Sequence, residues 1–188
     1  MASAPTHIVA TSAIAAFFHR PAVRWHLWAW GAALAIAPDL DVIGFRLGVA
    51  YGDMLGHRGL SHSLVAAVVV SGLVVASVYR QGAGVLTWKQ AWLFLFLAMA
   101  SHGFLDAFTN GGLGIAFFAP FSAERYFFPF RPIDVSPLSI RRFLSSGGVG
   151  ILLNEMLWVW LPSLVIAASV FSYRRFRSRS DTAIGRVY

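Results

Sequence analysis

Histidine and aspartate side chains recur at the ends of the apolar segments of this 188-residue chain. Imidazoles and carboxylates are costly in hydrocarbon, so their repetition where an apolar segment meets its loop indicates a common partner, most simply a divalent metal. The sequence contains no cysteine, so nitrogen and oxygen atoms would have to supply the ligands. We expect zinc first and manganese second. The candidate ligands are His7, Asp39, Asp41, His57, His62, His102 and Asp106.

The spacing of these residues suits a shared metal site. His102 and Asp106 are four residues apart, so on a helix they would project from the same side, one turn apart. Asp39 and Asp41 belong to the segment 38–41 (PDLD), where a proline ends a helix and two carboxylates offer hard oxygen ligands. Together these residues could bind one metal ion or several.

The segment 57–63 (HRGLSHS) adds two imidazoles around a glycine turn, with an arginine between them. A metal at such a site makes hydroxide available near neutral pH and polarises the scissile group. A neighbouring arginine could hold a phosphate, because its planar fork matches phosphate oxygens. We therefore expect catalytic roles for Asp39, His57, Arg58 and Arg125.

Each candidate also has an ordinary structural explanation. His7 alone could be an interfacial side chain, Asp39 a helix cap, and His102 with Asp106 a hydrogen-bonded pair. The supply of His and Asp from four segment ends to one face favours the metal site over these separate explanations. Glu155 lies inside the last apolar segment, and we expect it to pair with an arginine, ahead of serving as a ligand or general base.

The composition is typical of a membrane protein. Hydrophobic residues make up 57% of the chain, charged residues 12%, and the mean hydropathy is +0.66. The formal charge is +7, but five of the fifteen basic residues follow the last apolar segment. A basic cluster in that position indicates membrane topology and contact with anionic lipids, so we expect no nucleic-acid partner.

Five apolar segments predict an all-α fold, a polytopic integral membrane bundle of four to five helices. By length, we expect the third and fifth segments to span a membrane easily, while the first two are short. The region 111–148 between the last two segments is rich in proline and phenylalanine and predicts a surface connection folded over the membrane interface. We expect one membrane-embedded domain, 1–173, followed by a basic cytoplasmic tail, 174–188. The segments are 6–18, 25–37, 60–79, 90–106 and 149–171.

Charge also predicts orientation. The arginine-rich tail places the C-terminus in the cytoplasm. If both short segments cross the membrane, alternation brings all seven candidate ligands to the opposite, periplasmic face. The site would then lie at the depth of the lipid headgroups.

Several short motifs of the chain occur together in a known family. They are 6–7 (TH), 38–41 (PDLD), 57–63 (HRGLSHS), 101–106 (SHGFLD), 110–112 (NGG), 120–126 (PFSAERY) and 131–133 (RPI). In these motifs, which cover most of the chain, it resembles the YdjM family of bacterial inner-membrane, metal-dependent hydrolases. The resemblance implies a multi-pass protein of the bacterial inner membrane with hydrolase activity. The order His, Asp, His and then His-x-x-x-Asp is also similar, less closely, to zinc-dependent phospholipase C enzymes.

We therefore predict a membrane-bound metal-dependent hydrolase that cleaves an ester or phosphoester bond. The substrate is expected to be a lipid or lipid-linked molecule, because the site would lie at headgroup depth among membrane lipids. Two alternatives remain open from the sequence. One is a carrier of metal ions or protons, and the other is a non-catalytic membrane scaffold with a structural metal.

Overall fold

A computed structural model describes residues 1–20, 23–79, 86–145 and 147–184, and these residues form an all-helical fold. Within this part of the chain, β-pairing is limited to two isolated bridges, Thr109 with Ile133 and Ile115 with Tyr126. The all-α prediction is therefore confirmed. The helices are α1 (Ala4–Phe18), α2 (Trp25–Ile36), η1 (Ala37–Leu47), η2 (Leu60–His62), α3 (Leu64–Tyr79), α4 (Trp88–Ala107), α5 (Ile140–Ser145), α6 (Gly148–Glu155), η3 (Met156–Trp160) and α7 (Leu161–Ile184).

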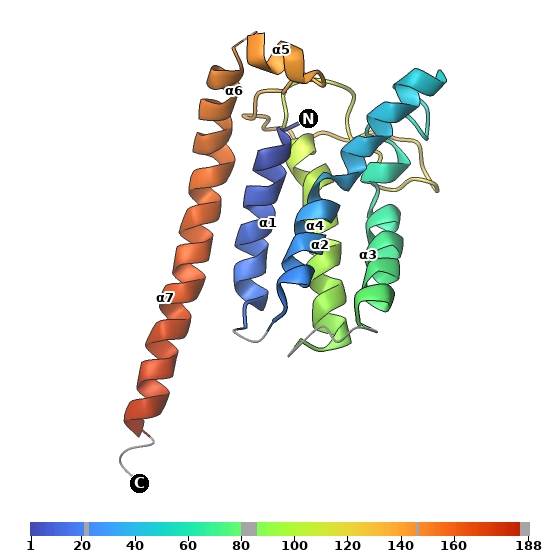
Figure 1. Ribbon diagram of the computed structural model, residues 1–188. Coiled ribbons are helices and arrows are strands. Elements are labelled where there is room, and N and C mark those ends of the chain that lie inside the picture. The colour runs from blue at the N-terminus through green and yellow to red at the C-terminus, as the bar shows by residue number, and fades with distance from the viewer. Residues whose placement is uncertain (21–22, 80–85, 146, 185–188) are drawn as a thin grey trace.

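Helix α4 is the centre of the bundle and contacts α1, α2 and α3 (Figure 1). Its Phe94 and Leu95 are fully buried and pack with Leu27 of α2. Gly31 of α2 permits this approach, because a β-carbon there would lie 2.4 Å from Cζ of Phe94. The close contact between α2 and α4 fixes where the ends of both helices lie.

Each predicted apolar segment contains a helix, but the lengths of two differ from expectation. After α2 the chain continues as the 3-10 helix η1, and Trp25–Leu47 together is long and apolar enough to cross a membrane. The third segment is shorter than predicted, because the Ser63 hydroxyl accepts a hydrogen bond from Ala66 N and α3 begins only at Leu64. Among the described residues, Gly148–Arg179 is the second span of sufficient length, and the apolar helix Leu64–Ser77 of the third segment is shorter than a span, contrary to expectation.

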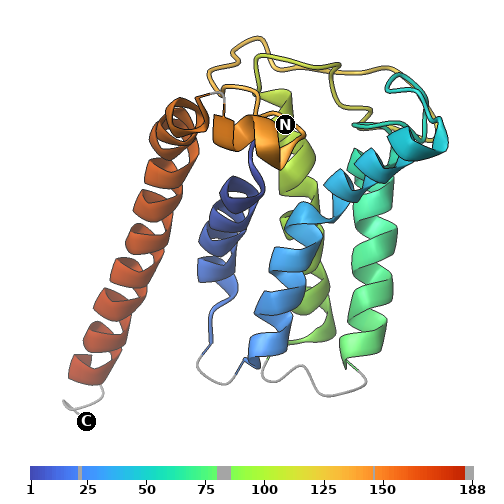
Figure 2. The ribbon, with the colours of Figure 1, turned by 45° about the horizontal axis from the view of Figure 1, so that its top comes forward.

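The connection between α4 and α6 runs across one end of the bundle (Figures 1 and 2). Its backbone bonds to the elements beneath it: Ala116 N donates to Arg58 O, and Phe128 N donates to Ala107 O, both at 3.0 Å. Phe121 is 85% exposed and lies on the outside of this connection. The region forms a surface connection at this end of the bundle and contains the short helix α5. Its predicted place at the membrane interface stays a prediction.

Helices α6, η3 and α7 form one long rod that contacts α1 and leans away from the rest of the bundle (Figures 1 and 2). Only 17% of its most apolar stretch is buried, and Leu153, Leu157 and Leu164 are each more than half exposed. An apolar surface of this extent suits contact with lipid. The helix continues unbroken past residue 173 into the predicted tail, whose Arg186 lies outside the described residues.

Candidate metal centre

All seven predicted ligands lie at the end of the bundle that the connection covers. His7 lies at the start of α1, the aspartates follow α2, His62 precedes α3, and His102 and Asp106 end α4. His7, His102 and Asp106 have no exposed surface. The convergence at one end of the fold is as the sequence predicted.

Four of these side chains direct acceptor atoms at a common point. One atom each from Asp39, His62, His102 and Asp106 lies within 4.8 Å of the others. Nε2 of His102 is 3.2 Å from Oδ1 of Asp39, and Nε2 of His62 is 3.7 Å from the same oxygen. Both Nε2 atoms are 3.9 Å from Oδ2 of Asp106. Around a tetrahedral zinc with ligand distances of about 2.0–2.1 Å, neighbouring ligand atoms lie about 3.3–3.4 Å apart.

The second nitrogen of each of these histidines fixes its tautomer. Nδ1 of His102 lies 2.7 Å from the carbonyl oxygen of Ala35, which can only accept, so Nδ1 carries the proton and Nε2 keeps its lone pair. Nδ1 of His62 lies 2.9 Å from Oγ of Ser61 and 3.2 Å from Oδ2 of Asp41. Metal-binding histidines typically bond through their other ring nitrogen to a group of the protein, as both do here.

The converging atoms have no hydrogen-bond partner within the described part of the chain. They include Nε2 of both histidines, both carboxylate oxygens of Asp39 and Oδ2 of Asp106. Buried polar atoms in native proteins nearly always have a partner, so a cluster of unpaired acceptors indicates a missing cation. The residues present therefore fit a divalent metal.

Burial tends to lower the pKa of His62, but the neighbouring carboxylates of Asp39 and Asp41 outweigh it and raise the pKa above the usual value. Without a metal, these carboxylates favour a proton on His62. A bound cation would replace that proton, as expected for an imidazole ligand.

Asp41 and His57 form a second group with His62, in a different environment. Asp41 accepts hydrogen bonds from Oγ of Ser61 at 2.6 Å and from the backbone N of Arg58 at 3.2 Å. Nδ1 of His57 lies 2.6 Å from its Oδ1. The oxygens of Asp41 thus have hydrogen-bond partners, whereas those of Asp39 have none in the described part of the chain.

His7 lies beside the four converging residues. Its ring stacks on that of His102, with centroids 3.7 Å apart and planes 12° from parallel. Its Nε2 is 3.6 Å from Oδ1 of Asp106, and neither of its ring nitrogens has a hydrogen-bond partner among the described residues. His7 therefore offers a nitrogen to the same buried space.

Arg58 is fully buried, and protein groups occupy all sides of its guanidinium. Nη1 donates to Gly111 O at 2.8 Å, Nη2 donates to Thr109 Oγ1 at 2.9 Å, and Nε lies 3.2 Å from Oδ2 of Asp106. Its φ of 65° is unusual for a residue other than glycine. The predicted contact of this fork with a substrate phosphate is thus replaced, in the structure, by contacts that orient Asp106.

Arg125 also contacts protein groups where a substrate phosphate was predicted, in the loop that carries His57. Its guanidinium donates to the carbonyl oxygens of His57 at 3.0 Å, Tyr51 at 3.2 Å and Asp53 at 3.0 Å. These bonds hold the loop that carries His57.

The expectation that Glu155 pairs with an arginine is wrong. Its buried carboxylate accepts hydrogen bonds from Ser3 N at 2.6 Å, from Thr6 Oγ1 at 2.7 Å and from the Ser3 hydroxyl. Ala2 N, one residue before Ser3, donates to Oδ1 of Asp106 at 2.8 Å. Glu155 thus anchors the chain segment that contacts the site.

Sequence reasoning missed the groups that orient the histidines. The Ala35 carbonyl carries no sequence signal, because every residue has such an acceptor. Ser61 lies between His57 and His62, and a hydroxyl beside a candidate ligand was a signal that could have been used.

Fold and site together define an all-helical protein in which a buried His and Asp cluster at one end of the bundle could hold a metal ion. The family model described as "YdjM inner membrane protein" matches residues 1–178. The chain is also 41% identical over 146 residues to the inner membrane protein YbcI of Escherichia coli (strain K12), covering 77% of this chain and 83% of that protein. No solved structure matches.

The chain therefore belongs to the YdjM family, as its motifs predicted, and is a protein of the inner membrane.

Proposed function

We propose that this protein is a membrane-bound, metal-dependent hydrolase that cleaves an ester or phosphoester bond of a lipid or lipid-linked substrate. The observation that carries the proposal is the set of unpaired acceptor atoms of Asp39, His62, His102 and Asp106, buried together at one end of the bundle. Membership of an inner membrane family supports a substrate drawn from the membrane.

These four side chains would hold the metal, with zinc the first choice and manganese the second. When bound, such an ion activates water and polarises the scissile group. Arg58 fixes the direction of the Asp106 carboxylate, because its Nε lies 3.2 Å from Oδ2. Asp41 holds the imidazoles of His57 and His62 in the required orientation.

His7 and His57 are the proposed proton-transfer groups. His7 has two unpaired ring nitrogens next to Asp106, and His57 is backed by the carboxylate of Asp41. A histidine held by a carboxylate is suited to accept a proton and return it. Arg125 acts in this proposal by positioning His57 and not by binding the substrate.

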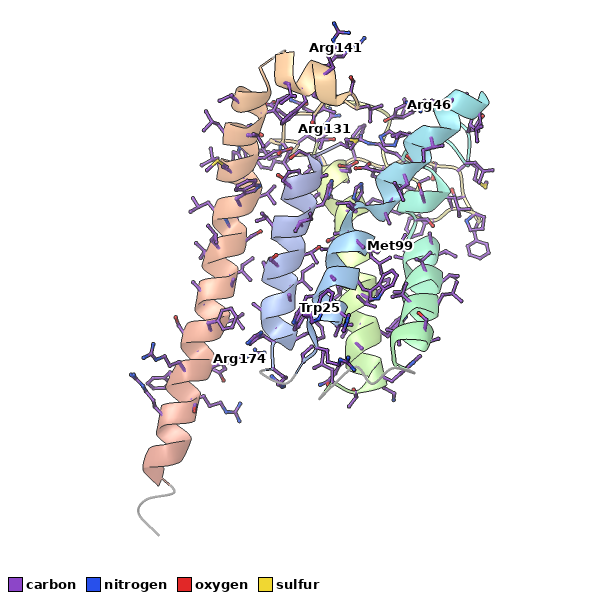
Figure 3. The ribbon with its side chains drawn as sticks, in the orientation of Figure 1. Trp25, Arg46, Met99, Arg131, Arg141 and Arg174 are labelled. Carbon is purple, nitrogen blue, oxygen red and sulfur yellow. The ribbon has the colours of Figure 1, made fainter. Side chains whose placement is uncertain are left out.

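The proposed placement in the membrane is multi-pass, with the site on the periplasmic side and the C-terminus in the cytoplasm. Arg174 lies on α7 at the end of the molecule opposite Arg46, Arg131 and Arg141 (Figure 3). The orientation rests on the arginines of α7 that follow the last apolar stretch.

A structural metal is the second candidate, and one observation favours it. Asp39 has the most exposed side chain of the four, at 12%, while those of His62, His102 and Asp106 have no exposed surface. Metal sites closed by four protein ligands are typical of structural zinc.

Hydrolysis of lipid phosphoesters separates the two candidates. The purified, zinc-loaded protein is incubated with phospholipid in mixed micelles, beside a His7→Ala variant and a metal-stripped sample. A hydrolase releases products in a metal-dependent manner, and we expect His7→Ala to lower the rate by about 10²–10⁴-fold while keeping the metal, as is usual for loss of an acid or base. Retention of metal with no turnover of ester or phosphoester lipids would favour the structural metal.

A further inference from the structure

A second feature lies at the other end of the molecule from the metal centre. Between the C-terminal end of α1 and the middle of α7 is a crevice of about 610 Å³. Its lining includes Phe17, Val170 and Tyr173, and three arginines: Arg20, Arg174 and Arg177. Among the described residues that line it, none is acidic.

Arg174 lines this crevice and bonds to the end of α1. Its Nη1 donates to the carbonyl oxygen of His19 at 3.0 Å, and its Nη2 donates to that of Phe17. These carbonyls belong to the last turn of α1 and its cap, where a helix leaves its acceptors unpaired. Arg174 thus joins α7 to α1 and adds positive charge at the base of the crevice.

The two remaining arginines are available to a ligand. Arg20 and Arg177 are exposed. Among the described residues, the guanidinium of Arg20 has one hydrogen bond, a 3.4 Å contact with the carbonyl oxygen of its neighbour His19. Planar guanidinium groups match the oxygens of a phosphate, and several basic residues at a membrane surface attract anionic lipid.

The apolar part of the lining matches the rest of a lipid. Phe17 is 55% exposed and Val170 is half-buried, so a hydrocarbon chain can lie against both. Tyr173 is 64% exposed, and an aromatic ring with a polar tip is typical of the headgroup level. The crevice therefore combines an apolar wall with a cluster of phosphate-binding groups.

From these observations we infer that the crevice between α1 and α7 binds one anionic phospholipid of the membrane, its phosphate held by Arg20 and Arg177 and its acyl chain against Phe17 and Val170. The site is separate from the metal centre and does not depend on the hydrolase proposal. The bound lipid would fill the crevice between α1 and α7.

Native mass spectrometry of the detergent-purified full-length protein tests this inference. The protein is titrated with phosphatidylglycerol or with phosphatidylcholine of the same acyl chains. We expect wild type to retain phosphatidylglycerol preferentially. The double variant Arg20→Gln/Arg177→Gln should bind it about 25-fold more weakly, since each basic residue near a membrane surface contributes roughly a fivefold factor.

Two further variants keep the test sharp. Arg46→Gln/Arg141→Gln removes the same charge from exposed positions at the other end of the molecule and should leave binding unchanged. Val170→Trp keeps every charge but fills the apolar part of the crevice, and should also weaken phosphatidylglycerol binding. Equal binding of the two lipids by wild type, equal weakening by both charge variants, or unchanged binding by Val170→Trp would overturn the inference.

Discussion

At the scale of single residues, the arrangement is explained by what a buried carboxylate requires. Among the described residues, neither oxygen of Asp39 and only one oxygen of Asp106 has a hydrogen-bond partner. An unpaired buried charge is strongly destabilising, so these carboxylates need a cation. Arg58 supplies part of that charge to Asp106, and the lone pairs of His62 and His102 leave room for a metal to supply the rest.

The sequence revealed the seven candidates because His and Asp are conspicuous at the ends of apolar segments. It could not reveal how the arginines are used. Arg125 donates to backbone carbonyls such as that of Tyr51, and any residue can supply such an acceptor. Arg58 contacts Gly111 O and Thr109 Oγ1, more than 50 residues away in the chain, and local patterns do not specify such pairs. The sequence therefore did not show that these arginines bind protein groups and not a substrate phosphate.

Replacement of Arg58 by lysine tests its positioning role. Lysine keeps the charge but cannot bond Gly111 O, Thr109 Oγ1 and Asp106 together. We expect Arg58→Lys to destabilise the fold by about 1–3 kcal/mol, the cost of leaving buried acceptors unpaired. The midpoint of thermal unfolding in detergent measures this, with the exposed Arg46→Lys as the matched control. Identical midpoints for Arg58→Lys and wild type would show that the three contacts do not stabilise the protein.

At the scale of the helices, the existence of each element was predictable and its ends were less so. Long apolar runs predicted α1, α2, α3, α4 and α7, because such runs need the internal hydrogen bonds of a helix in a membrane. The 3-10 helix η1, which continues α2 to Leu47, was not predicted, because Pro38 was interpreted as the end of a helix. The hydrogen bonds that hold the connection 111–148 against α4 join residues far apart in sequence, so local patterns could not specify them.

The contact between α2 and α4 can be tested through glycines. In Gly31→Ala the added carbon would lie 2.4 Å from Cζ of buried Phe94, so either the Phe94 ring must leave its packed position or the helices must move apart. We expect a loss of about 1–3 kcal/mol in the free energy of unfolding. Gly72→Ala in α3 is the control, because the atom nearest to a β-carbon added there is Nε1 of Trp92, at 3.9 Å. That change should be neutral or stabilise by about 0.5–1 kcal/mol. A Gly31→Ala protein as stable as wild type would contradict the tight contact.

At the scale of the whole molecule, the two ends of the bundle differ in chemistry. One end holds the His and Asp cluster beneath the connection, and the other carries Arg20, just after α1, and the arginines of α7 around the crevice. The positive-inside pattern predicts that these ends face opposite sides of the inner membrane. The separation of the ends follows from the helix order, which the sequence already specified.

Single cysteines test this orientation cleanly, because the chain has none of its own. Gly52 is exposed in the loop at the site end, and Lys89 is exposed at the start of α4 at the other end. In intact cells with a permeable outer membrane, an impermeant thiol reagent should label Gly52→Cys and spare Lys89→Cys. The reverse labelling would put the site in the cytoplasm.

The metal content of the purified protein shows whether Asp39, His62, His102 and Asp106 hold a metal ion. The detergent-purified wild type is analysed by mass spectrometry beside His62→Ala/Asp106→Ala and beside His26→Ala, a histidine outside the cluster. We predict at least one equivalent of zinc or manganese in wild type and His26→Ala, and its loss in the double variant with membrane insertion retained. A wild type that stays metal-free after incubation with zinc and manganese, or a double variant that keeps its metal, would contradict the account.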